Sequence, residues 1–93
     1  MLELKTTSQF KKDYKRIKKR GYNLELLDEI IDVLLAEKEL DEKYKNHQLI
    51  GNYQGFFECH IESDWLLIYA LNQKSLILTA ARTGTHADLF RNK

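Results

Sequence analysis

The spacing of hydrophobic residues changes from a period of two to a helical period within the first twenty positions of the chain. Residues 2–6 alternate leucine or threonine with charged side chains, which is the pattern of a short, half-buried strand. Phe10, Tyr14 and Ile17 then recur at helical spacing, with lysines on the other faces. The chain therefore begins with a predicted strand followed by an amphipathic helix.

Capping residues set the limits of this helix and begin a second one. Thr7 or Ser8 can accept a backbone N–H of the first helical turn, and Gly21 suits the left-handed residue that ends a helix. Asn23 offers the next cap. The predicted second helix is about 15 residues long. Its broad hydrophobic stripe consists of Leu24, Leu27, Ile30, Ile31, Leu34 and Leu35.

The second half of the chain has the pattern of strands. Residues 41–52 lack periodicity and are predicted to be a connection. Strands are predicted over residues 53–61, 65–71 and 75–82, separated by short polar turns, and a short helical turn over residues 86–90. Short turns between strands favour antiparallel hairpins.

The predicted order is β-α-α-β-β-β, an α+β fold. An antiparallel sheet with an N-terminal helical hairpin packed on one face would bury the hydrophobic residues, and the opposite face would be partly open. With 93 residues and 11.0 kDa, the chain is expected to form a single domain over residues 1–93. This length excludes large multidomain enzymes and leaves a small hydrolase, a binding module or a regulated effector.

Charge is unevenly distributed although the net charge is only +1. Residues 1–20 carry eight lysines and arginines against two acidic residues. Residues 21–42 carry eight acidic residues against one lysine. The first helix therefore presents a basic face and the second an acidic face, and the two helices are expected to attract each other.

Composition indicates a reducing compartment. Cys59 is the single cysteine, so neither an internal disulfide nor a thiolate metal cluster can form, and we expect it to lie in the core. No stretch approaches the roughly 20 hydrophobic residues of a membrane span, and residues 1–5 lack the pattern of a signal peptide. We expect a cytoplasmic protein without a membrane partner.

Three histidines, His47, His60 and His86, are the main candidates for chemistry. The predicted topology can bring them to one face of the sheet, together with Glu58, Asp64 and Arg82. Such a set suits phosphodiester cleavage by an adjacent 2′-hydroxyl, which needs a base, an acid and cations near the phosphate. Histidine can act in either proton role. From the residues alone, ordinary structural histidines remain the alternative.

Three segments resemble those of YafQ-type toxins of the RelE/ParE superfamily. The segments are residues 45–55 (KNHQLIGNYQG), 58–69 (ECHIESDWLLIY) and 82–90 (RTGTHADLF). They match the family's histidine–glycine segment, its spaced histidine and Asp-Trp pair, and its C-terminal R-x-G-[ST]-H-x-x-L-F signature. The predicted N-terminal helices match in pattern and position.

The resemblance implies a RelE/ParE-like, microbial-RNase-like fold and the toxin of a type II toxin–antitoxin system. Such toxins are ribosome-dependent endoribonucleases that cleave mRNA in the A site by 2′-hydroxyl attack without metal or cofactor. The implied partners are a cognate antitoxin, the ribosome with its A-site mRNA, and operator DNA only through the antitoxin complex.

The resemblance also implies roles for individual residues. Catalytic positions of the family match His47, His60, Asp64 and His86. We expect His86 to be the general acid and Asp64 or His60 to be the base. Substrate-binding positions match Arg82, Phe90, Glu58 and Trp65. Arg82 and His47 would stabilise phosphate charge and Phe90 would stack on a base, whereas Trp65 could serve only in packing and Glu58 could pair with Arg82.

The basic helix supplies candidates for ribosomal RNA binding, because lysines bind phosphate backbones without reading sequence. These candidates are Lys11, Lys12, Lys15, Lys18 and Lys19. The alternative is a merely solvated helix face. Two rival functions remain: a ParE-like toxin that acts on DNA gyrase and needs no histidine cluster, and a degenerate module that only binds antitoxin.

Overall fold

The computed structural model of the chain describes residues 1–90. Its helices and strands follow the predicted order, with one additional strand and two 3₁₀ turns. The elements are β1 (Glu3–Thr6), α1 (Ser8–Lys19), α2 (Leu24–Leu35), the 3₁₀ turn η1 (Glu42–Tyr44), β2 (His47–Gln48), the 3₁₀ turn η2 (Gly51–Tyr53), β3 (Phe57–Glu62), β4 (Trp65–Asn72), β5 (Ile77–Gly84) and α3 (His86–Phe90).

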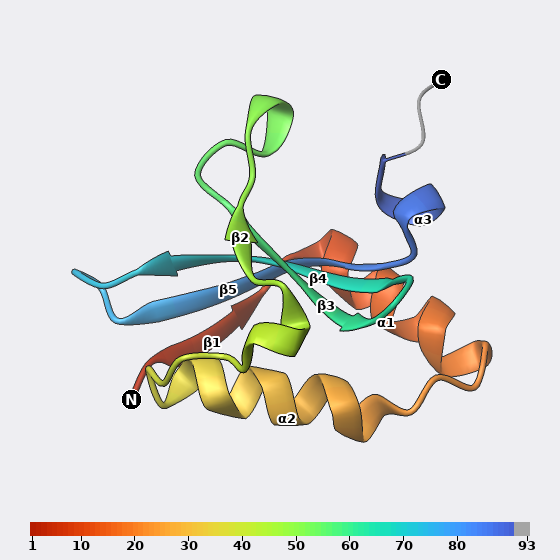
Figure 1. The fold of residues 1–93 in the computed structure, drawn as a ribbon, viewed down its shortest axis with the longest axis horizontal. Coiled ribbons are helices and arrows are strands. Elements are labelled where there is room, and N and C mark those ends of the chain that lie inside the picture. Colours follow the sequence, from red (N-terminus) through yellow and green to blue (C-terminus); the bar gives the residue numbers. More distant parts are fainter. Residues whose placement is uncertain (91–93) are drawn as a thin grey trace.

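The sheet is mixed, so the prediction of a purely antiparallel sheet was wrong. The strand order is β1-β5-β4-β3-β2, and β1 runs parallel to β5 while all other pairs are antiparallel. Turn lengths could not predict the pairing of β1, because both long helices lie between β1 and the next strand in sequence. Both helices follow β1 in the chain, and the last strand, β5, lies beside β1 in the sheet (Figure 1).

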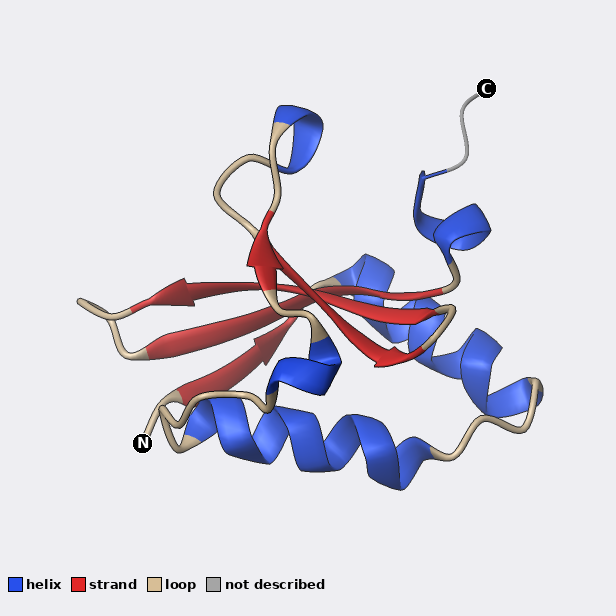
Figure 2. Ribbon diagram, viewed as in Figure 1, coloured by secondary structure: helices blue, strands red, loops and turns tan. Residues whose placement is uncertain are grey.

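Both long helices cover one face of the sheet, as predicted, while α3 and the loop around η2 lie on the other side (Figure 2). The side chain of Thr7 caps α1 by accepting the N–H of Phe10 at 2.9 Å. The same hydroxyl donates to the carbonyl of Ala81 at 2.8 Å, which ties the start of α1 to β5. Asn23 caps α2 as predicted, and Gly21 between the helices has a φ of 83°.

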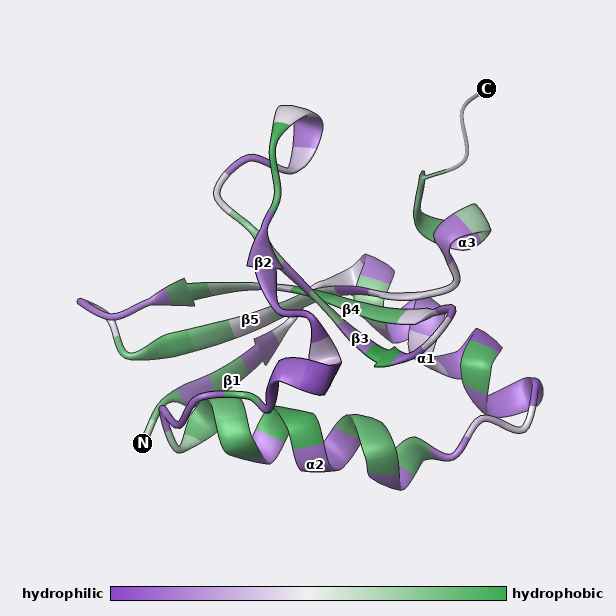
Figure 3. Cartoon of the chain, in the orientation of Figure 1, coloured by the Kyte–Doolittle hydropathy of each residue, from purple (hydrophilic) through white to green (hydrophobic). Residues whose placement is uncertain are grey.

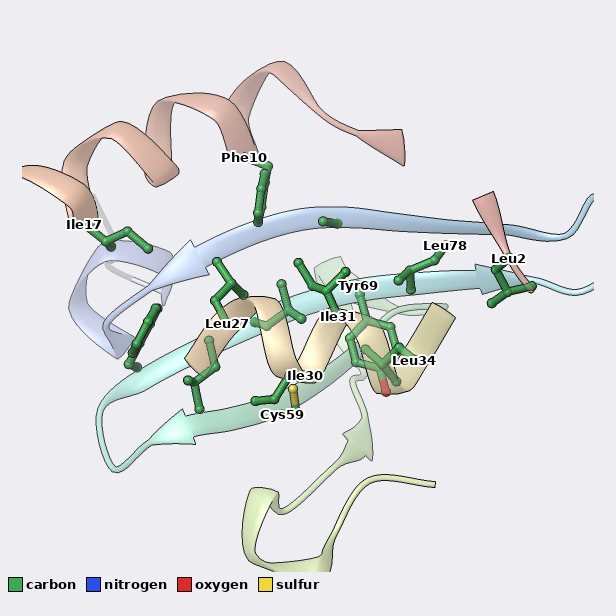
Figure 4. Close-up of a cluster of buried hydrophobic side chains, with 14 residues drawn as sticks. Leu2, Phe10, Ile17, Leu27, Ile30, Ile31, Leu34, Cys59, Tyr69 and Leu78 are labelled. Atoms are coloured by element: carbon green, nitrogen blue, oxygen red, sulfur yellow. The ribbon is translucent and has the colours of Figure 1, made fainter. Parts of the chain in front are cut away.

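A main hydrophobic core fills the space between the helices and the sheet (Figure 4). Phe10 and Ile17 of α1 and Leu27 of α2 belong to this core together with Cys59 and Tyr69 of the sheet. Cys59 is fully buried, as predicted, and burial raises the pKa of its thiol to about 12. Hydrophobic and polar residues alternate along α2, which follows from its position between core and solvent (Figure 3).

A second, smaller core lies on the opposite face of the sheet. Leu66 and Ile68 of β4 and Ala81 of β5 are covered there by Leu89 of α3. Leu49, Tyr53 and Phe56 from the loop before β3 pack against the same cluster. This face is therefore partly covered, and the cover consists of the segments that flank the candidate site.

Two segments between α2 and β3 differ from the prediction. His47–Gln48 forms the edge strand β2 inside the predicted connection, and the hydrophilic sequence of this strand gives no alternation to detect (Figure 3). β3 begins at Phe57 rather than at residue 53, because Gly51–Tyr53 forms a 3₁₀ turn and Gly55 takes a φ of 94°. Within residues 1–90, no helix is long and hydrophobic enough to cross a membrane.

Candidate active site

Alternation along β3 places Glu58 and His60 on the sheet face turned away from the long helices. Cys59 and Ile61, which alternate with them, face the main core. His47 of β2 lies directly opposite Glu58 in the antiparallel register, so its side chain shares that face. The sheet geometry therefore brings two of the predicted histidines together with a carboxylate.

The Glu58 carboxylate lies between these two histidines. Its Oε2 is 3.1 Å from Nε2 of His60 and 3.7 Å from Nε2 of His47. The contact with His60 is a hydrogen bond, and the longer contact with His47 is electrostatic. Glu58 is only 6% exposed, so its negative charge acts at short range on both rings. Nδ1 of His47 donates to the carbonyl of Lys45 at 2.8 Å, which fixes that ring from its other side.

Asp64 orients the third histidine. Its Oδ1 accepts the backbone N–H of His86 at 2.9 Å and lies 2.7 Å from Nδ1 of the same residue. These two hydrogen bonds to His86 lower the pKa of Asp64 below its ordinary value. An ionised carboxylate can only accept, so Nδ1 of His86 carries the proton and Nε2 is the nitrogen left for chemistry.

Ring separations show that all three predicted histidines converge. The ring centroids of His47 and His60 lie 6.4 Å apart, and those of His60 and His86 lie 5.7 Å apart. Phe90 follows one turn after His86, with ring centroids 6.3 Å apart, and its other side meets the ring of Tyr53. Phe90 is 39% exposed, so a ring surface is available beside the histidines. We call His47, Glu58, His60, Asp64 and His86 the histidine cluster.

Arg82 is held by Asp13, so the alternative pairing of Glu58 with Arg82 is not observed. Nε of Arg82 donates to Oδ2 of Asp13 at 2.7 Å, and Nη2 donates to Oδ1 at 3.2 Å. This hydrogen-bonded carboxylate raises the pKa of Arg82, with a smaller contribution from Tyr53. Arg82 lies opposite Ile68 in the register, on the face of the histidine cluster.

Trp65 is buried in the main core, which does not fit its predicted role in substrate binding. The side chain is 2% exposed and lies on the face covered by the long helices. Its indole N–H donates to Oγ1 of Thr83 at 2.9 Å, and its ring packs edge-on against Tyr22. Trp65 is a core residue, as the alternative interpretation of packing had it.

Asp88, which was not predicted from the sequence, attaches α3 to the end of α1. Its carboxylate accepts two hydrogen bonds from Arg20, at 2.7 and 3.2 Å, and one from the backbone N–H of Thr85 at 3.0 Å. These contacts hold the pKa of Asp88 well below the ordinary range. A Cβ at Gly84 would lie 2.9 Å from Asp88 Oδ2, which explains the glycine before α3.

Asp13 was also missed, although the sequence holds a signal for it. It lies three residues after Phe10 and four before Ile17, on the hydrophobic side of a helix whose other charges are all basic. The predicted attraction between the two helices is not observed: within residues 1–90, no ion pair joins α1 to α2. The arginines of α1 contact Asp13 and Asp88 instead.

The five predicted RNA-binding lysines are all exposed on α1. They are Lys11, Lys12, Lys15, Lys18 and Lys19. A cavity of about 450 Å³ adjoins His60 and is lined by η1 and by the β3–β4 turn. Lys43 and Lys45 at its rim add positive charge next to the histidine cluster.

Three side chains of the histidine cluster are close enough to share a cation. Glu58, His60 and His86 each offer one ligand atom, and these atoms lie within 4.8 Å of one another. Imidazole nitrogens with one carboxylate oxygen are a set that suits zinc or copper. The same groups suit metal-free proton transfer, so the geometry fits both.

Comparison with known proteins identifies close relatives of the whole chain. The sequence profile described as "Bacterial toxin of type II toxin-antitoxin system, YafQ" matches residues 2–91. The mRNA interferase toxin YafQ of Escherichia coli (strain K12) is 37% identical over 89 residues, covering 95% of this chain and 95% of the relative.

Solved structures agree with the sequence comparison. A metal-bound toxin from Helicobacter pylori superposes with a TM-score of 0.91 at 39% identity, covering 97% of this chain and 100% of that one. The E. coli DinJ–YafQ complex gives a TM-score of 0.87 at 35% identity, covering 97% and 99%. The predicted fold class is thus shared with experimentally determined relatives.

Proposed function

The chain belongs to the YafQ family of toxins from type II toxin–antitoxin systems, and from this premise we propose that its histidine cluster cleaves mRNA. It is an mRNA interferase, that is, an endoribonuclease. The resemblance found in the three sequence motifs is thereby confirmed. Membership favours an mRNA interferase over a gyrase-directed toxin, and the intact histidine cluster argues against a degenerate binding module.

One observation supports the site assignment: three histidines distant in sequence meet on the face of the sheet that also carries Arg82, whose guanidinium is fixed by Asp13. Cleavage would proceed by attack of a ribose 2′-oxygen on the adjacent phosphorus. The bond to the 5′-oxygen breaks, which leaves a 2′,3′-cyclic phosphate and a free 5′-hydroxyl. This reaction needs one group to take the 2′-hydroxyl proton and another to protonate the leaving 5′-oxygen.

His86 suits the role of general acid. Its Nδ1–H is bound to Asp64, so Nε2 can deliver a proton to the 5′-oxygen. The ionised Asp64 also stabilises the imidazolium from which that proton comes. Because Asp64 is engaged in this way, we assign it to orienting His86 and not to the role of base.

His60 suits the role of base. Its Nε2–H donates to Glu58, which leaves the lone pair of Nδ1 for the 2′-hydroxyl proton. The buried Glu58 carboxylate stabilises the positive charge that then develops on the ring. Glu58 thus acts through His60 and His47, and Arg82 with His47 would stabilise charge on the phosphate oxygens.

Binding of RNA would use the surfaces around the cluster. Phe90, backed by Tyr53, offers an exposed ring for stacking on a base. The lysines of α1 would contact ribosomal RNA phosphates and place the cluster at the A-site codon. The acidic outer face of α2 would point away from RNA.

We further propose the setting in which this activity operates. Residues 1–93 act as one toxin domain in the cytoplasm, where ribosomes and mRNA are present. A cognate antitoxin binds the toxin and blocks cleavage, by analogy with the E. coli DinJ–YafQ complex. Operator DNA is contacted only through that complex.

Substitution of the histidines tests the assignment. His60→Ala and His86→Ala should each lower single-turnover cleavage by about 10²–10⁴-fold, because each removes one proton-transfer group. Lys74→Ala, in the distant turn between β4 and β5, is the matched control and should cut at the wild-type rate. Wild-type cleavage by either histidine variant would contradict the assignment.

A further inference from the structure

Asp13 is a fully buried carboxylate in a helix whose other charged side chains are basic. It lies on α1, at the edge of β5, where it faces the backbone of Thr83 and the side chain of Arg82. A buried carboxylate costs free energy unless hydrogen bonds and opposite charge compensate it.

The position of Asp13 follows from the end of β1. This strand pairs with β5 only as far as Ala80, so the N–H of Thr83 faces α1 instead of a neighbouring strand. Oδ2 of Asp13 accepts that N–H at 3.2 Å. Within residues 1–90, no buried side-chain polar atom lacks a hydrogen-bond partner. Asp13 thus accepts the backbone N–H of Thr83 that β1 leaves unpaired at the edge of β5, next to Arg82 of the candidate site.

The same Asp13 carboxylate forms a two-point contact with one side of the Arg82 guanidinium. Nε and Nη2 donate to the two oxygens at 2.7 and 3.2 Å, which is a two-point contact. A guanidinium has five N–H groups in a rigid plane, so this contact fixes the direction of those that remain. The Arg82 side chain keeps 19% exposure, so part of it is accessible to a ligand, and Tyr53 of the loop before β3 lies beside it.

Arginines of α1 and its C-terminal end also contact Asp88 of α3. Nη2 of Arg16 lies 3.6 Å from Asp13, and its Nη1 lies 3.5 Å from Asp88. Arg20 then binds Asp88, the residue that fastens α3 and with it His86. Contacts made by α1 and by Arg20 at its end therefore position both Arg82 and His86.

We propose that Asp13 is a positioning residue of the nuclease: it presets the guanidinium of Arg82 toward the scissile phosphate. This proposal rests on the proposed function, because it takes Arg82 as the phosphate-binding cation. Asp13 does not touch the substrate and acts through Arg82. Without the carboxylate, Arg82 would sample other rotamers and lose alignment as charge develops on the phosphate.

The direct test is a double-mutant cycle on cleavage of ribosome-bound mRNA. Arg82→Ala should lower kcat by about 100-fold or more, and Asp13→Asn, which keeps the shape, by about tenfold or more. In the Arg82→Ala background, Asp13→Asn should have no further effect, because the two act as a unit. Asp28→Asn, exposed on α2, is the control and should leave kcat unchanged.

A second readout separates positioning from general structural support. Guanidinium ion added at millimolar concentration should partly restore cleavage to Arg82→Ala, since the Asp13 carboxylate can bind it. The same ion should not restore cleavage to the variant that carries both Arg82→Ala and Asp13→Asn. Rescue that is equal in both backgrounds would overturn the proposal.

Other outcomes also discriminate. Equal losses from Asp13→Asn with and without Arg82 would overturn positioning. Full activity of Arg82→Ala would instead refute the proposed role of Arg82. If Asp13→Asn does not fold, Arg82→Lys tests the same point, since lysine keeps the charge but cannot bridge carboxylate and phosphate in one plane. Arg82→Lys should then be as impaired as Arg82→Ala, and wild-type activity would contradict the proposal.

Discussion

At the scale of single residues, the three histidines differ in what holds their rings. His86 is bound through Nδ1 to Asp64, His60 through Nε2 to Glu58, and His47 through Nδ1 to a backbone carbonyl. These contacts leave Nε2 of His86 and His47, but Nδ1 of His60, for chemistry. The distinct roles of otherwise identical side chains therefore follow from their partners and not from their own identity.

The imidazole nitrogens of the histidine cluster also make it sensitive to metal ions. Chelation with EDTA should leave cleavage unchanged, because histidines and Arg82 supply the proposed chemistry. Added Zn²⁺ or Cu²⁺ should inhibit, since a cation held by Glu58, His60 and His86 would replace the Glu58–His60 hydrogen bond and tie up side chains needed for proton transfer. Cleavage rates with EDTA and with graded Zn²⁺ measure both effects. Loss of activity in EDTA, restored by metal, would contradict the proposed mechanism.

Candidate site residues could be predicted from the sequence where they belong to a motif. The convergence of His47, His60 and His86 was predicted and is observed. Asp13 and Asp88 were not predicted, because each acts on a residue about 70 positions away, and only the tertiary fold creates that contact. Trp65 shows the reverse case, a motif residue whose indole serves the core.

At the scale of elements, α3 has only five residues and depends on α1 for its position. So short a helix is not stable alone in water. Leu89 packs it onto the sheet, and Asp88 ties it to Arg20 and Arg16. Since His86 begins this helix, its placement depends on contacts made by the other end of the chain.

The Asp88 contact should give stability a defined pH dependence. The carboxyl pKa of Asp88 is lowered in the folded chain, so its stabilisation is fully present above the ordinary carboxyl value of about 4. It is lost as the pH falls from there towards the lowered pKa. Asp88→Asn should reduce the free energy of unfolding by about 1 kcal/mol at pH 6.5, because the partly exposed Arg20 is screened by solvent.

Urea unfolding at pH 6.5 and pH 3 measures this dependence. The difference between wild type and Asp88→Asn should shrink at pH 3, because the Asp88 carboxyl is then largely protonated in the unfolded chain while it stays ionised in the folded one. Asp28→Asn, an exposed α2 residue, provides the comparison. A wild-type advantage that stays constant or grows on acidification would show that the charge of Asp88 does not stabilise α3.

Elements with strong periodicity were predicted well, and weakly patterned ones were not. α1, α2 and β4 lie where hydrophobic spacing placed them, with β4 extending one residue further. β2 was missed, since two polar residues at a sheet edge carry no alternation. The parallel pairing of β1 was missed because no turn chemistry connects β1 directly to β5.

At the scale of the whole molecule, the sheet separates a supporting side from a working side. The long helices lie on one side of the sheet, and α3 and the loop around η2 lie on the other (Figure 2). The main core is on the side of the long helices, and the second core is on the other side with the histidine cluster and Phe90. Helix α1 belongs to both, because it buries Asp13 while exposing its lysines. A single helix can thus connect RNA contact with the position of Arg82.

Charge reversal on α1 tests the RNA-binding surface. Changing Lys11, Lys15 and Lys18 together to glutamate should weaken ribosome binding and reduce its dependence on salt, because fewer counterions are released. Sedimentation with ribosomes at several salt concentrations measures this. Replacing Lys74 with glutamate is the control on a distant turn. Unchanged affinity and salt slope would identify the lysine face as solvated only.

The most direct test of the central claim uses programmed ribosomes with a defined A-site codon. Wild-type protein and His86→Ala are added separately, and mRNA 5′ ends are mapped by primer extension. The histidine cluster predicts cuts within the A-site codon for wild type, with free 5′-hydroxyl ends, and none for His86→Ala. Equal cutting by both proteins, or no cut on any codon by folded wild type, would contradict the account.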